Sequence, residues 1–117
     1  MEFPVRRVEK PWGYELIFAH TDRYVGKVLH IDAGQALSLQ YHEHKDETFF
    51  VASGELELLV EESDSLVRRT LRAGDSYHVL PPTRHRMIAG AVGCELFEVS
   101  TPEIDDVVRL EDRYGRR

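Results

Sequence analysis

The chain contains one cysteine, Cys94, in 117 residues, so no internal disulfide can form. No apolar run approaches the roughly 20 residues that a membrane-spanning helix requires. The first residues, MEFPVRR, lack the apolar stretch of a secretory signal. Without a disulfide, any cross-link that stabilises the fold must be a metal or a partner chain. Without a membrane helix or a secretory signal, we expect a soluble cytoplasmic protein.

Basic side chains are outnumbered, with 15 Lys and Arg against 21 Asp and Glu and a net charge of −6. Phosphate backbones are bound by an excess of Lys and Arg, so this balance argues against a nucleic-acid partner. It still allows a local basic site for a small anion such as a phosphorylated metabolite. The length and the 42% hydrophobic content indicate one folded domain with a real core.

Short bursts of alternating apolar residues, separated by turn signals, indicate an all-β chain. Nine strands are predicted, at Tyr14–Ala19, Tyr24–Ile31, Ala36–His42, Glu47–Ala52, Glu55–Val60, Leu66–Leu71, Ser76–Leu80, Arg84–Ala89 and Cys94–Ser100. Ser53-Gly54, between two apolar runs, predicts a hairpin. So many strands in a short chain favour an antiparallel barrel or jelly roll, which hides the edges of its sheets.

One segment departs from the strand pattern. Ser100-Thr101-Pro102-Glu103 offers an N-cap, an early proline and a capping-box glutamate, and apolar residues follow at helical spacing. The whole chain, residues 1–117, is expected to form a single domain. Its barrel would span about residues 14–100, and a short C-terminal helix and a charged tail would span residues 101–117.

Four residues form a candidate metal site. On a strand, Gln40 and His42 point to the same face, and Glu47 at the start of the next strand can return beside them. His85, after Pro81-Pro82, is the fourth candidate. Imidazole, amide oxygen and carboxylate together suit one divalent ion, with zinc first and manganese, cobalt, nickel or iron as alternatives. His44 competes with Gln40 as a ligand, because it shares the same strand parity.

The spacing of these residues resembles the two motifs of the cupin superfamily. The first reads Gly34, five residues, Gln40, one residue, His42, four residues, Glu47, six residues, Gly54, with glutamine at the first histidine position. The second keeps the spacing Gly74, five residues, Leu80, one, Pro82, two, His85, three, Ala89, but Leu80, Pro82 and Ala89 differ from the family pattern. The resemblance implies a single-domain cupin: an antiparallel jelly-roll barrel with the metal site inside it.

Gln40, at the first histidine position of the motif, indicates one group of proteins within the cupin superfamily. Zinc-dependent phosphomannose isomerases are cupins with a Gln, His, Glu, His ligand set. Residues 8–117 resemble the C-terminal isomerase domain of type II mannose-6-phosphate isomerase/mannose-1-phosphate guanylyltransferases, here as a stand-alone domain. The similar segments are Lys10-Pro11-Trp12-Gly13, Leu37–His42 and Asp105–Arg116. The guanylyltransferase domain has no counterpart, so nucleotidyl transfer is not implied.

The resemblance implies a metal-dependent sugar-phosphate aldose–ketose isomerase of carbohydrate metabolism. Glu98 and His44 are the candidate catalytic bases, and Lys45, Arg84 and Arg86 are candidate contacts for a phosphate or a hydroxyl group. The expected partners are a small sugar phosphate and a second copy of the chain, with no nucleic acid and no membrane. Two alternatives stay open: a non-catalytic module that binds metal or sugar, and another metal-dependent cupin enzyme such as a dioxygenase.

Overall fold

The computed structural model describes all 117 residues and consists of nine strands, every pair of them antiparallel. The all-β prediction is confirmed. The strands are β1 (Arg6–Lys10), β2 (Gly13–His20), β3 (Val25–Ile31), β4 (Leu39–Tyr41), β5 (Glu47–Glu62), β6 (Ser65–Arg72), β7 (Ser76–Val79), β8 (His85–Ser100) and β9 (Val108–Glu111).

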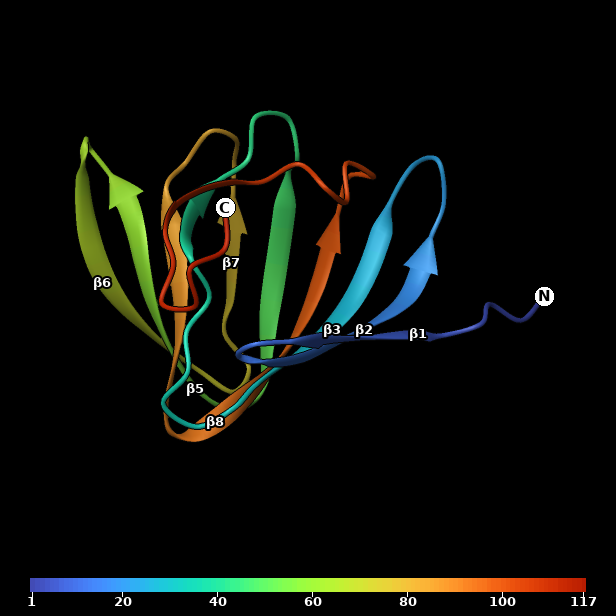
Figure 1. Ribbon diagram of the computed structural model, residues 1–117, viewed down its shortest axis with the longest axis horizontal. Helices are drawn as coiled ribbons and strands as arrows, with labels where there is room; N and C mark the ends of the chain where they lie inside the picture. The colour runs from blue at the N-terminus through green and yellow to red at the C-terminus, as the bar shows by residue number, and fades with distance from the viewer.

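Two long strands, β5 and β8, join two halves of the curled sheet. Residues 94–100 of β8 pair with β3 and with residues 47–54 of β5, and this half continues to β2, β1 and β7. Residues 85–89 of β8 pair with residues 56–60 of β5, and this half continues to β6, β4 and β9. Figure 1 shows the halves facing each other, with the C-terminal segment (red) crossing one end.

A bend in β5 allows one strand to serve both halves. Its buried side chains stand at odd positions over residues 47–51 and at even positions over residues 56–60. Register shifts around Ser53 and Gly54 produce this change, so both stretches turn their apolar side chains inward. The hairpin predicted at Ser53-Gly54 is therefore wrong, because the two predicted strands are one bent strand.

The hairpin lies further along the chain. Glu62 pairs with Ser65, and the two residues between them, Ser63 and Asp64, have φ angles of 52° and 67°. Two consecutive positive φ angles define a tight turn of the type that matches the twist of antiparallel strands. Like β5, β8 is one strand where two were predicted: the predicted strands Arg84–Ala89 and Cys94–Ser100 fall at its two ends.

The predicted C-terminal helix is wrong. Residues 101–107 form an irregular segment with one turn at residues 104–105, and the following residues form β9, which pairs with β4. Thr101 and Asp46 exchange two hydrogen bonds, because each backbone N–H donates to an oxygen of the other residue at 3.0 Å. A helix this short has little stability of its own, so strand pairing and these contacts decide the conformation. The structure contains no helix long and apolar enough to cross a membrane.

The hydrophobic core lies between the two halves of the sheet. Phe49, Val51 and Leu96 come from one half, and Leu56 and Leu58 come from the other, and all five are fully buried. This core leaves the end of the barrel crossed by the C-terminal segment free for polar side chains.

Candidate metal centre

Three buried side chains converge inside the barrel, and their candidate ligand atoms all lie within 4.8 Å of one another. His42 follows β4, while Glu47 and His85 begin β5 and β8. Oε1 of Glu47 lies 3.2 Å from Nε2 of His42 and 3.1 Å from Nε2 of His85. The three residues are only 1–2% exposed. Residues separated by up to 43 positions thus form one compact nitrogen and oxygen cluster.

Backbone carbonyls hold both imidazoles in the orientation that a metal ligand needs. Nδ1 of His42 lies 2.6 Å from the carbonyl oxygen of Asp106, and Nδ1 of His85 lies 3.0 Å from that of Thr83. A carbonyl oxygen only accepts, so each Nδ1 carries a proton and donates it, and each Nε2 is the ring atom that faces Glu47. Nε2 of His85 is buried without a hydrogen-bond partner. A buried ring nitrogen without a hydrogen-bond partner, 3.1 Å from a carboxylate oxygen, fits a cation bound between the two groups.

Glu47 supplies negative charge to the same point. Burial alone would raise the pKa of Glu47, but contacts with the two imidazoles and the charge of Lys45 hold it well below its usual value. Nζ of Lys45 lies 3.2 Å from Oε2 of Glu47, so the other carboxylate oxygen faces the imidazoles. A donor set of two imidazoles and one carboxylate is one that divalent zinc and its neighbours accept.

Gln40 lies beside this cluster. Its backbone pairs with His85 on one side and with Arg109 on the other, and its side chain lines the same cavity as His42 and Glu47. Oγ of Ser38, which is fully buried, donates to Oε1 of Gln40 at 2.7 Å. An amide oxygen has two lone pairs, so this bond leaves one of them free.

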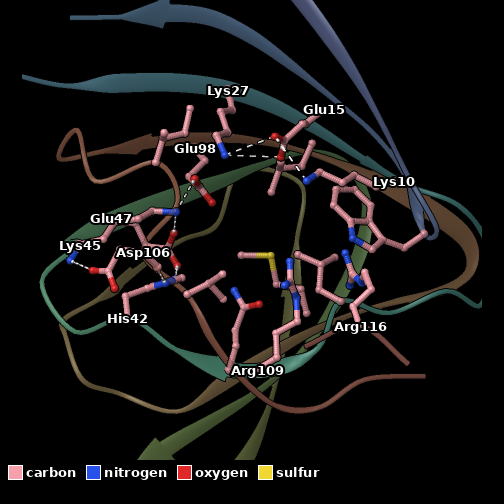
Figure 2. Close-up of a pocket in the computed structure, with 17 residues that line it drawn as sticks. Lys10, Glu15, Lys27, His42, Lys45, Glu47, Glu98, Asp106, Arg109 and Arg116 are labelled. Carbon is pink, nitrogen blue, oxygen red and sulfur yellow. Dashed lines mark hydrogen bonds and ion pairs between the residues drawn. The ribbon is translucent and has the colours of Figure 1, made fainter. Parts of the chain in front are cut away.

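The cavity in front of the cluster holds a buried row of charges (Figure 2). Nζ of Lys45 lies between Glu47 and Glu98, 3.5 Å from Oε2 of Glu98. Burial and the nearby charge of Glu47 raise the pKa of Glu98 to about 7. Burial alone would lower the pKa of Lys45, but the charges of Glu98 and Glu47 raise it above its ordinary value. Lys45 is therefore a fixed cation, and Glu98 is a carboxyl group that can exchange a proton near neutral pH.

The other three predicted site residues lie elsewhere. His44 is exposed, and Arg84 and Arg86 are half-buried, but none of the three lines the cavity. Arg84 pairs with Glu61 at 3.1 Å. Nε of Arg86 donates to the carbonyl oxygen of Leu37. Strand parity places Arg86 on the face of β8 opposite to His85, and Arg84 directly precedes the strand with the same parity, so neither charge points toward the cluster.

Sequence reasoning missed several cavity residues. The similar segments near the two ends of the chain supply Lys10, Trp12, Asp106, Arg109 and Arg116, all of which line the cavity. Their family resemblance was visible in the sequence, but no spacing rule links residue 10 with residue 109. Only the crossing of the C-terminal segment over the barrel brings them together.

Comparisons with solved structures identify the fold. An RmlC-like cupin from Shewanella frigidimarina matches with a TM-score of 0.74 and 18% identity over 87% of both chains. KdgF from a Halomonas species matches with a TM-score of 0.74 and 23% identity, over 88% of this chain and 91% of that one. The chain therefore has the cupin fold.

Sequence comparisons identify the family to which the chain belongs within this fold. Residues 4–112 match the family described as Mannose-6-phosphate isomerase C-terminal, and the chain belongs to this family. It is 36% identical over 116 residues to the protein of Escherichia coli named Mannose-1-phosphate guanylyltransferase, a match that covers 95% of this chain but 23% of that protein. The chain thus spans about a quarter of the length of the curated relatives that it matches.

Proposed function

We propose that this chain is a metal-dependent sugar-phosphate isomerase, which interconverts mannose 6-phosphate and fructose 6-phosphate or a related aldose–ketose pair. The observation that carries the proposal is the buried cluster of His42, Glu47 and His85, whose candidate ligand atoms lie within 4.8 Å of one another beside a charged cavity. The family to which the chain belongs is described by the same activity, which supports this substrate class.

His42, Glu47 and His85 would hold the metal, with Gln40 as a fourth ligand. Zinc suits this donor set best, and manganese, cobalt, nickel or iron are alternatives. When bound, the metal supplies a Lewis acid that stabilises negative charge on the carbonyl and hydroxyl oxygens of the substrate. The exposed side chain of His44 makes it the weaker candidate for the fourth position.

Glu98 is the residue that we propose to move the proton between C1 and C2 of the sugar. An aldose–ketose isomerisation needs a base with a pKa near the working pH, and burial raises the pKa of Glu98 to about 7. The Nζ of Lys45 contacts both Glu98 and Glu47, so its cation holds the two carboxyl groups in place. His44, the other candidate base, does not line the cavity.

The first experiment is a metal analysis of protein purified without a histidine tag, joined to an isomerase assay on the metal-loaded protein. We expect about one divalent ion per chain, conversion of mannose 6-phosphate, and loss of both in His42→Ala. His78→Ala, an exposed histidine outside the cavity, should keep both.

The same experiment separates the alternatives. Folded protein that refuses added metal would contradict both enzyme hypotheses and leave a sugar-binding module. Protein that binds iron and shows no isomerase activity would favour another metal-dependent cupin reaction. Glu98→Gln should keep the metal and lose most of the activity, and full activity in this variant would contradict the role of Glu98.

A further inference from the structure

Two neighbouring cavities meet at the end of the barrel that the C-terminal segment crosses. One contains His42 and Glu47, and the other lies between β1, β2 and that segment. Six residues line both cavities, namely Lys10, Glu15, Lys27, Ile104, Val107 and Arg109. At this shared wall, one part of a ligand can contact the cluster of His42, Glu47 and His85 while another part extends toward the second cavity.

The shared wall carries an excess of positive charge. Nζ of Lys27 lies 3.4 Å from Oε1 of Glu15, and Nζ of Lys10 lies 4.0 Å from the same oxygen. One carboxylate therefore faces two ammonium groups. Arg109 adds a third cation, so the side chains of the wall carry three positive charges against one negative charge.

No Asp or Glu side chain pairs with Arg109. Its Nη1 donates to the backbone oxygen of Arg117, and its Nε is buried without a hydrogen-bond partner. A buried donor without a partner costs free energy, which an acceptor on a ligand would recover. Arg116, in contrast, is paired with both carboxylate oxygens of Asp112 at 3.0 and 3.1 Å, so its charge is already compensated.

Strand pairing places Arg109 next to the cluster of His42, Glu47 and His85. Arg109 on β9 pairs with Gln40 on β4, and Gln40 pairs in turn with His85. Directly paired residues of an antiparallel sheet share a face, so Arg109 and Gln40 both reach the cavity. Figure 2 shows Lys10 and Arg109 on the side of the pocket away from His42, Glu47 and Lys45.

We propose that Lys10 and Arg109 bind the phosphate group of a phosphomonoester, with the reacting end of the molecule turned toward His42, Glu47 and His85. This inference rests on the proposed function and assigns the phosphate to residues other than Lys45, Arg84 and Arg86. A phosphomonoester carries a charge of about −1.5 to −2 at pH 7, which matches the net charge of the wall. Arg109 offers a planar donor group, and Lys10 offers a point charge.

The test is calorimetric titration of the full chain with inorganic phosphate. Lys10→Met and Arg109→Met should each weaken phosphate binding by about tenfold or more, because each removes a charge-assisted hydrogen bond. Arg109→Lys should lose less, because it keeps the charge. Arg113→Met is the matched control and should bind as the wild type does, since Arg113 is exposed on the same tail and lies outside both cavities.

Folded Lys10→Met and Arg109→Met variants that bind phosphate as the wild type does would overturn the proposal, and so would a wild-type protein that binds no phosphate. An isomerase whose KM for mannose 6-phosphate is unchanged in Arg109→Met would overturn the phosphate site and leave the proposed function intact. The wild type could also bind phosphate but show no isomerase activity with any of the candidate metals. If Arg109→Met then loses phosphate binding, the result would support the site and contradict the proposed function.

Discussion

Asp106 organises the candidate site although it is not one of the proposed ligands. Its carboxylate accepts hydrogen bonds from the backbone N–H groups of Glu43, His44 and Lys45 at 2.7–3.1 Å. Its backbone carbonyl accepts from Nδ1 of His42. One residue of the C-terminal segment thus holds the loop between β4 and β5 and also sets the tautomer of an imidazole in the cluster.

Asp106→Ala should therefore weaken metal binding without abolishing it. The loop that joins His42 to Glu47 loses three hydrogen bonds, so we expect a metal Kd roughly 10- to 100-fold higher than that of the wild type. Asp105→Ala, its exposed neighbour, is the control and should leave the metal Kd unchanged. Titration with a competing chelator measures both, and an unchanged Kd in Asp106→Ala would show that the loop is held by other contacts.

The same carboxylate makes stability depend on pH. Burial opposes its ionisation, but the three backbone N–H groups hold the pKa of Asp106 below its ordinary value of 3.8. The folded-state pKa lies below the unfolded one, so the ionised group stabilises the fold above the unfolded pKa, and this contribution is lost as pH falls through the folded pKa. Asp106→Ala should lose less stability than the wild type between roughly pH 5 and pH 3 in urea unfolding. Identical pH profiles would argue against this linkage.

At the scale of elements, the bends of β5 and β8 decide whether the two halves of the sheet can face each other. Gly54 has a φ of 77°, and a Cβ there would lie 2.2 Å from the carbonyl oxygen of Gly93. Gly93 itself has a φ of 68°. The two bent strands therefore approach each other at a point where a side chain on residue 54 has no room.

Gly54→Ala should destabilise the protein by at least ~2 kcal/mol, because it combines backbone strain with a clash against a neighbouring backbone. Gly90→Ala is the control, since a Cβ there meets nothing within 4 Å and its φ is not in the left-handed region. The free energy of unfolding in urea measures both variants. A Gly54→Ala variant as stable as Gly90→Ala would mean that the bend relaxes to admit a side chain.

At the scale of the whole molecule, the outer face of the sheet carries an exposed apolar patch. The rings of Phe50 on β5 and Phe97 on β8 stack with centroids 6.3 Å apart, and both residues are more than 40% exposed. Val99 on β8 is 57% exposed and lies on the same face as Phe97. Adjacent exposed apolar side chains of this kind mark interaction surfaces. We name Phe50, Phe97 and Val99 the outer patch.

We expect the outer patch to join two copies of the chain as a homodimer. A charge placed in the middle of an apolar interface remains desolvated and unpaired, so Phe97→Glu should shift the protein to monomer. Leu66→Glu, on the exposed β6 side of the hairpin, is the control and should stay dimeric. Light scattering coupled to size exclusion gives the mass directly, and a monomeric wild type would contradict this expectation.

The local sequence was sufficient for the all-β class, for most strand positions and for the proximity of His42 and Glu47, because alternation and short loops act within a few residues. In the structure, the alternation that buries Leu96 also turns the side chain of Glu98 inward. Tertiary structure alone decided that Ser53-Gly54 is a bend and that residues 101–111 form an irregular segment and a strand, since distant partners outweigh weak local preferences. It also decided which cations enter the cavity. Lys10 and Arg109 line the same cavity although β1 and β9 lie near opposite ends of the chain, and no rule of spacing connects them.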